Sequence, residues 1–146
     1  DMTPSIPDKK ETEYLHSQLK EACDAADQKY YEKFKKNCDE YFFLQHRNEP
    51  RGEGGIFFDH LNTGAWEADF SFVQDVGKKT LEVITNVVKQ KKDLKWTEEE
   101  KDQQLIKRGR YVEFNLIWDR GTLFGLKTGG STEAILMSMP PSAKWK

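Results

Sequence analysis

Residues Tyr111–Trp118 alternate between two kinds of side chain, and this pattern constrains the fold more than any other feature of the chain. Every second residue from Val112 onward is apolar, and the residues between them include Glu113 and Asn115. Period-two alternation with aromatic and β-branched residues is typical of a β-strand that turns one face toward a core. The stretch therefore predicts a strand over Arg110–Trp118.

The residues that follow predict two more strands. Asp119–Gly121 has turn composition, and Leu123–Lys127 is a short apolar run that fits a return strand. Gly129–Gly130 indicates a second turn, and Ala134–Met139 alternates again before two prolines end it. Together with a short apolar run at Ile56–Asp59, these segments predict an α+β fold with an antiparallel sheet.

Helices are expected between the strands. Apolar residues at helical spacing predict helices over Lys10–Ala26, Tyr30–Gln45 and Ala65–Gln90. A capping box of Thr97 and Glu100 predicts a shorter helix that ends at Arg108, with Gly109 as its stop. The longest of these helices has the clearest apolar stripe, which we expect to face the core: Trp66, Phe70, Val73, Gly77, Leu81, Ile84 and Val88.

Size and composition exclude several classes of protein. A chain of 146 residues is long enough for one domain with its own core. The formal net charge is −2, whereas nucleic-acid-binding domains are usually basic, so no nucleic-acid partner is expected. No apolar run approaches the length of a membrane span. The two cysteines, Cys23 and Cys38, form no metal-binding motif and are expected to be reduced core thiols.

Several multi-residue blocks occur in the order and wording of one enzyme family. Along the chain these blocks are DMTP at 1–4, CDEYFF at 38–43, HRNE at 46–49, GGIFFD at 54–59, YVEFNLIWDRGTLFGLKTGG at 111–130 and EAILMSMPP at 133–141. Through them the chain resembles oxygen-dependent coproporphyrinogen III oxidase over almost its whole length. Agreement across several ordered blocks is far more specific than any single glycine pattern.

The resemblance implies a fold and an activity. It implies that residues 1–146 are one domain within a larger coproporphyrinogen oxidase domain, with an antiparallel sheet flanked by helices on both faces, in a cytoplasmic homodimer. Because Asp1 falls inside a family motif whose glycines should precede it, we expect the latter half of a family member. The implied reaction converts two propionates of coproporphyrinogen III to vinyl groups, with dioxygen as co-substrate and no required cofactor.

The family's catalytic and substrate-binding positions fall on particular residues here. Asp1 matches the aspartate expected to meet the pyrrole nitrogens of the substrate, and Arg120 is the expected propionate binder. Gly129, Gly130 and Ser131 match the substrate-binding segment near the second turn. Ser131 stands where the family has arginine, so the charged contact at that position is in question.

The glycine-rich loop after the second helix adds two expected substrate-binding residues, Arg47 and Arg51. Its glycines allow backbone to approach a ligand closely, and guanidinium groups suit carboxylates. His16 and His46 align with positions sometimes credited as metal ligands, so a divalent metal is an alternative. Two histidines thirty residues apart without a carboxylate at ligand spacing are weak support for it.

Other functions remain open at this point. The main alternative is an inactive tetrapyrrole-binding or dimerisation fragment of the same fold, because the family's general-acid histidine belongs upstream of Asp1. A metal-dependent hydrolase that uses His16, His46, His60 and Asp59 is a further class, and it requires bound metal.

Overall fold

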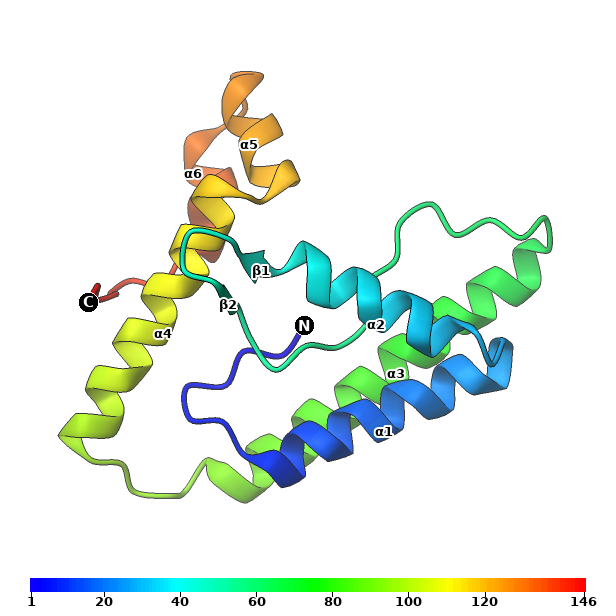
Figure 1. Cartoon of the computed structure of the whole chain (residues 1–146), viewed down its shortest axis with the longest axis horizontal. Coiled ribbons are helices and arrows are strands. Elements are labelled where there is room, and N and C mark those ends of the chain that lie inside the picture. The colour runs from blue at the N-terminus through cyan, green and yellow to red at the C-terminus, as the bar shows by residue number, and fades with distance from the viewer.

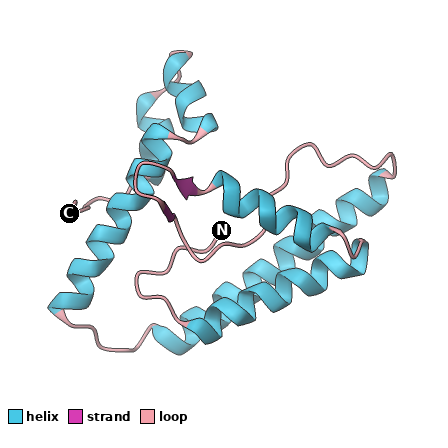
Figure 2. Ribbon diagram, in the orientation of Figure 1, coloured by secondary structure: helices cyan, strands magenta, loops and turns pink.

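The computed structural model describes residues 1–146 and is mostly helical (Figures 1 and 2). Its elements are α1 (Lys9–Ala26), α2 (Tyr30–Tyr41), β1 (Phe43–Leu44), β2 (Glu49–Pro50), α3 (Trp66–Lys91), α4 (Glu98–Ile117), α5 (Arg120–Lys127), α6 (Thr132–Ile135) and the short 3₁₀ helix η1 (Leu136–Ser138). None of the helices combines the length and the apolar composition needed to cross a membrane.

The main core lies between α1, α2 and α3. α1 and α3 run side by side along their length (Figure 1). Asp8 caps α1 by accepting a hydrogen bond from the backbone N–H of Lys10 at 2.9 Å, which fixes where the helix begins. Cys23 and Cys38 are buried and free, as expected. The buried cluster consists of Leu15, Leu19, Cys23, Tyr31, Phe34, Phe72 and Val83.

α3 forms where the sequence predicts it, but it buries a different face. Its fully buried residues are Phe72 and Val83, and Gly77 neither breaks nor caps the helix. The apolar stripe expected in the core is exposed: Trp66 is 71% exposed and Leu81 is 68% exposed. The prediction was wrong because α3 is apolar on more than one side, and periodicity alone cannot tell which side packs on α1.

α4 begins at the predicted capping box and continues past its predicted end. Thr97 and Glu100 exchange the two expected hydrogen bonds. Gly109 does not stop the helix. Instead it lets the C-terminal segment pass close to α4, because a Cβ at this position would collide with the backbone carbonyl of Lys144. The helix then runs on to Ile117.

The strand predicted over Arg110–Trp118 is therefore wrong. Glu113, Phe114 and Asn115 are buried consecutively, whereas a half-buried strand alternates. The polar members of this trio have partners inside the fold: the Asn115 side chain donates to the backbone carbonyl of Tyr111 at 2.8 Å, and Glu113 binds arginine. Because these polar groups have hydrogen-bond partners inside the fold, they can be buried and need not lie on a solvent-facing side of a strand.

The α+β class is confirmed in a coarse form, since the only sheet is β1 paired with β2 in antiparallel register. α2 ends at Tyr41, four residues before its predicted end, and the chain enters this hairpin. The strands predicted at Ile56–Asp59, Leu123–Lys127 and Ala134–Met139 are absent. The first is irregular, and the other two lie in helices α5, α6 and η1.

Candidate functional site

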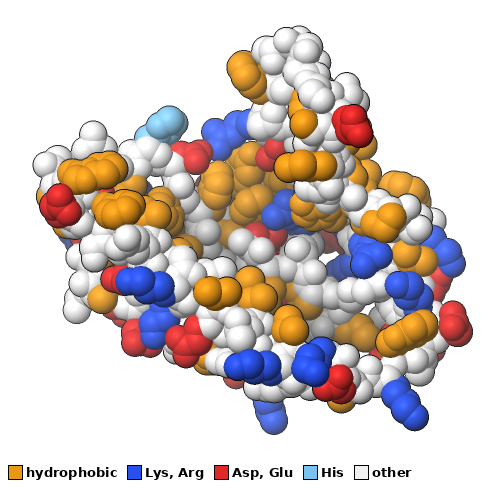
Figure 3. Space-filling model, turned by 180° about the vertical axis from the view of Figure 1, so that it is seen from behind, with side chains coloured by type: hydrophobic (Ala, Val, Ile, Leu, Met, Phe, Trp, Pro, Cys, Tyr) orange, Lys and Arg blue, Asp and Glu red, His pale blue; other side chains and the backbone are white.

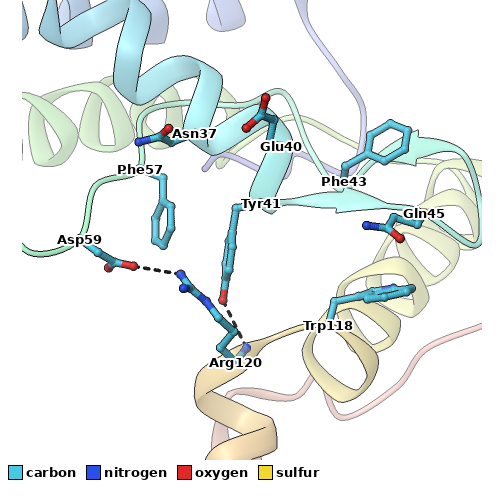
Figure 4. A pocket seen from close by; sticks show the side chains of 9 residues that line it. All are labelled: Asn37, Glu40, Tyr41, Phe43, Gln45, Phe57, Asp59, Trp118 and Arg120. Carbon is cyan, nitrogen blue, oxygen red and sulfur yellow. Dashed lines mark hydrogen bonds and ion pairs between the residues drawn. The ribbon is translucent and has the colours of Figure 1, made fainter.

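A cavity of about 570 Å³ opens where the C-terminal end of α2 meets the start of α5 (Figure 4). Tyr41 and Phe57 form one wall, with their rings stacked at 4.5 Å and nearly parallel at 16°. Trp118 lies on another side, and Asp59 and Arg120 stand at the rim. Its volume is within the range of small-molecule sites, and its walls combine aromatic surface with convergent charge.

The local structure fixes Arg120 beside the aromatic wall. Asp119 caps α5 by accepting from the backbone N–H of Thr122 at 2.7 Å, and its other oxygen accepts from the Tyr41 hydroxyl at 3.0 Å. The guanidinium of Arg120 consequently lies over the Tyr41 ring, 4.7 Å from its centre. Asp119 thus joins the first turn of α5 to the end of α2.

Arg120 is available to a ligand. Its guanidinium donates to Asp59 at 2.9 Å, yet the side chain is 66% exposed. Hydrogen bonding to Tyr41 and Asp59 raises the pKa of Arg120, so the group stays cationic. Exposed ion pairs contribute little to stability. A ligand carboxylate can therefore replace Asp59 at small cost.

A second charged pair joins Asp1 to Arg51. The Nε of Arg51 donates to a carboxylate oxygen of Asp1 at 2.9 Å, and the two side chains are 10% and 1% exposed respectively. The guanidinium lies over the adjacent rings of Phe42 and Phe114, at 4.0 and 4.5 Å from their centres. Burial lowers the pKa of Arg51 from its usual value, and the adjacent aromatic faces favour the cation.

The glycine-rich loop holds Asp1 in this place. The backbone N–H of Met2 donates to Gly54 at 2.9 Å, and that of Glu53 donates back to Met2 at 2.8 Å. Gly52 faces this segment with no room for a side chain, because a Cβ would collide with the Met2 carbonyl. The glycines predicted to allow close approach of a ligand instead allow close approach of residues 1–3.

Arg47 belongs to a third cluster, centred on Glu113. Its Nε donates to Glu113 at 2.8 Å, and the Nε2 of His46 donates to the same carboxylate at 2.9 Å. Because the indole N–H of Trp118 can only donate, its 3.0 Å contact makes Nδ1 of His46 an acceptor and places the proton on Nε2. The hydrogen bond from Arg47 is the main reason why the pKa of Glu113 falls from 4.5 to about 2.

Glu113 gives folding a pH dependence of defined sign. Its folded pKa lies below its ordinary value, so its stabilising effect is complete above about pH 4.5 and is lost as the pH falls toward 2. We expect the urea midpoint to drop on acidification from about pH 5 to about pH 2.5, and Glu113→Gln to remove part of this slope. Glu82→Gln, at an exposed carboxylate on α3, is the matched control and should keep the full slope. Identical slopes for Glu113→Gln and the wild type would contradict the assignment.

The two predicted metal ligands lie in separate clusters. The Nε2 of His16 donates to the backbone carbonyl of Glu53 at 2.9 Å, and its Nδ1 is 2.9 Å from the Tyr31 hydroxyl. His46 is held by Glu113 and Trp118, so all four ring nitrogens already have protein partners. The chain contains no group of three or more histidine, cysteine, aspartate or glutamate side chains arranged to bind a metal ion. These residues do not fit a metal site, and the metal prediction stays untested.

Gly129, Gly130 and Ser131 lie in the turn between α5 and α6, at the tip of the molecule remote from the N-terminus (Figure 1). Gly129 has φ = 73°, which favours glycine, and the N–H of Gly130 donates to the carbonyl of Gly125 at 3.0 Å. Ser131 caps α6 through its side chain. The three residues therefore have structural roles in ending one helix and starting the next.

The predicted site residues thus occupy five places and not one. Asp1 and Arg51 form one pair, Arg120 lines the cavity, and Arg47 and His46 lie at the Glu113 cluster. Gly129–Ser131 form the α5–α6 turn, and His16 lies apart from all of these, between Tyr31 and Glu53. The aromatic residues Tyr41, Phe42 and Phe114 connect the first two places, with ring centres 4.9–5.7 Å apart. The cavity walls Phe57 and Trp118 were not predicted, because aromatic residues in such patterns normally indicate core.

The fold and the cavity define an α+β protein with an aromatic site that carries one cation, Arg120, beside the carboxylates of Glu40 and Asp59. The sequence model described as coproporphyrinogen III oxidase matches residues 1–146, and the chain belongs to that family. It is 61% identical over 145 residues to the oxygen-dependent coproporphyrinogen-III oxidase of Rickettsia bellii (strain OSU 85-389). The enzymes of that name from Rickettsia africae (strain ESF-5) and Rickettsia rickettsii (strain Sheila Smith) are 61% and 60% identical. Each match covers 99% of this chain and 52% of the relative, so the chain spans about half the length of these relatives.

Proposed function

We propose that this chain takes part in the oxygen-dependent oxidative decarboxylation of coproporphyrinogen III to protoporphyrinogen IX, the reaction of haem biosynthesis. The observation that carries the proposal is the family match over residues 1–146, together with about 60% identity to enzymes named for this substrate. We propose that the chain forms part of the surface that binds the substrate.

The cavity supports this assignment through its chemistry. The substrate is a flexible tetrapyrrole that carries several carboxylates, so a site for it needs aromatic or apolar surface and fixed cations. Tyr41, Phe57 and Trp118 offer the first, and Arg120 offers one cation, beside the carboxylates of Glu40 and Asp59. A guanidinium can hold a carboxylate by two parallel hydrogen bonds, which would orient one propionate at the rim.

The proposed reaction removes a carboxylate and a neighbouring hydrogen from each of two propionates. Each conversion to a vinyl group releases carbon dioxide, a proton and an electron pair, and dioxygen accepts the electrons. Asp1 is proposed to face a pyrrole N–H, since a carboxylate there increases the electron density of the ring that must be oxidised. In the free chain its side chain is 1% exposed and paired with Arg51, so this contact requires the pair to open. The proposal routes no step through a metal, because the ring nitrogens of His16 and His46 are occupied.

The setting of the reaction belongs to the same proposal. Dioxygen is the proposed co-substrate, a cytoplasmic homodimer is the proposed assembly, and no nucleic acid takes part. The relatives are named as oxygen-dependent, which supports dioxygen as the co-substrate.

Binding of the substrate to the chain tests the proposal directly. We expect coproporphyrinogen III, added under nitrogen, to quench tryptophan fluorescence, because Trp118 lines the cavity. Trp118→Phe should remove most of the quenching and leave the affinity measured by calorimetry within about twofold. Absence of saturable binding would contradict a role in substrate recognition.

A second candidate follows from the length of the chain, which is about half that of the relatives. The chain alone is then an inactive tetrapyrrole-binding or dimerisation module. Incubation with coproporphyrinogen III in air and under nitrogen separates the two. Oxygen-dependent formation of protoporphyrinogen indicates the enzyme, whereas binding without turnover indicates the module.

A further inference from the structure

An apolar stripe on α3 is uncovered along nearly the whole helix. It consists of Trp66, Phe70, Val73, Leu81, Ile84 and Val88, all of them exposed. With Gly77 between Val73 and Leu81, these positions recur at three- and four-residue spacing, so they share one side of the helix over about 33 Å. Hydrophobic side chains are visible on the molecular surface when the molecule is viewed from behind (Figure 3). Several large apolar side chains exposed along one side of a helix mark a candidate interaction surface.

The whole chain exposes more surface than a closed domain of its mass. A folded monomer of 17.0 kDa is expected to expose about 7,700 Å². This chain exposes 9939 Å² and buries only 15 of its 146 residues. The excess is roughly 2,200 Å², above the roughly 800 Å² that one partner contributes to a standard interface. An excess of this size is typical of a hydrophobic core that lacks one of its sides.

A cavity, which we call the socket, adjoins the stripe. It has a volume of about 310 Å³, lies beneath residues 1–3, and has mainly apolar walls. Ile84 belongs both to the stripe and to this cavity, beside Leu15, Ile56 and Val76. A pocket that opens beside an apolar surface suits a buried anchor side chain from a partner. The occupant would thereby reach Asp1, which lines the same cavity.

We propose that the α3 stripe and its socket bind the part of the family fold that this chain does not span. The relatives contain about as many residues again as the matched 145, which is enough polypeptide to cover an area of this size. The occupant presents an apolar face about as long as α3 and inserts one large apolar side chain into the socket. This contact requires no substrate, so it stands or falls independently of the proposed chemistry.

Co-expression tests the proposal. This chain is co-expressed with the portion of the Rickettsia bellii relative that lies outside the matched residues, and complexes are weighed by light scattering after gel filtration. We expect a complex of the two polypeptides that contains one copy of each per unit. Its Trp66 emission should shift to shorter wavelength, since this side chain passes from water to an apolar contact, and Trp66→Phe should remove that shift.

Substitutions locate the contact. Leu81→Glu and Ile84→Glu place a charge on the stripe and should weaken the complex by roughly a hundredfold or more. Met137→Glu makes the same change at an exposed apolar residue outside the stripe and should leave affinity within about twofold. The monomeric fold of each variant is checked by circular dichroism. Three results would overturn the proposal: no complex, a complex insensitive to both stripe variants, or self-association of this chain through the stripe in place of the mixed complex.

Discussion

Arg51→Met is expected to lower the free energy of unfolding by about 3 to 5 kcal/mol. The substitution keeps an apolar side chain against Phe42 and Phe114 but leaves the carboxylate of Asp1 buried without its cation. An uncompensated buried charge costs far more than the lost attraction alone. Urea unfolding followed by circular dichroism measures the change.

A double variant separates charge from packing. Asp1→Asn combined with Arg51→Met removes both charges and should recover much of the loss, because a neutral amide is less costly to bury than a carboxylate. Lys36→Met breaks an exposed ion pair with Glu40 on α2 and should change the free energy of unfolding by less than about 0.5 kcal/mol. If Arg51→Met is as mild as Lys36→Met, the Asp1–Arg51 pair does not stabilise the fold.

Local sequence rules predicted α1 and the start of α4 correctly because those features are decided locally. Asp8 caps α1 within its own turn, and the Thr97–Glu100 capping box is completed within four residues. The end of α4 is decided by a distant contact instead. Glycine often ends a helix, but Gly109 is needed here because the backbone of Lys144 passes too close for a side chain. Rules based on neighbouring residues cannot predict a contact with a residue so distant in the sequence.

The predicted hairpin failed for the same reason. Alternation over residues 111–118 placed Glu113 off the apolar face, where it needs water or a polar partner, and the partner it finds, Arg47, lies 66 residues earlier in the chain. Once that pair forms, consecutive residues on α4 can all be buried, and the alternation of polar and apolar residues no longer indicates a strand. The stripe on α3 shows the converse. Its apolar residues do lie on one side of the helix, as the periodicity predicts, but no other part of the described fold packs against that side.

The candidate site was predictable residue by residue but not as an arrangement. The type of residue at Arg120 and Arg51 indicated carboxylate binding, and the structure gives each a carboxylate partner, Asp59 and Asp1 respectively. Burial alone decides which of the two guanidinium groups a ligand can reach. Arg51 is enclosed by aromatic rings and already committed to Asp1, whereas Arg120 is exposed beside a cavity. This difference favours a structural role for Arg51 and supports the proposed ligand-binding role of Arg120.

Arg120→Met should weaken binding of coproporphyrinogen III by roughly tenfold or more, with little change in the urea midpoint. The guanidinium is the cation at the rim of the cavity, so its loss removes a charge-assisted contact with a propionate and leaves the aromatic walls in place. Titration under nitrogen measures the affinity, and added salt should reduce the difference between wild type and variant.

The neighbouring residue Asp59 shows whether the effect comes from the ligand. In the free chain Asp59 occupies the guanidinium that a propionate would bind, so Asp59→Asn should strengthen binding in the wild-type background. In the Arg120→Met background its effect should be smaller, because the competition for the guanidinium is gone. Lys127→Met, which removes a cation from the far end of α5, should have little effect. Equal losses for Arg120→Met and Lys127→Met would mean that the substrate responds to net charge and that this cavity does not bind it.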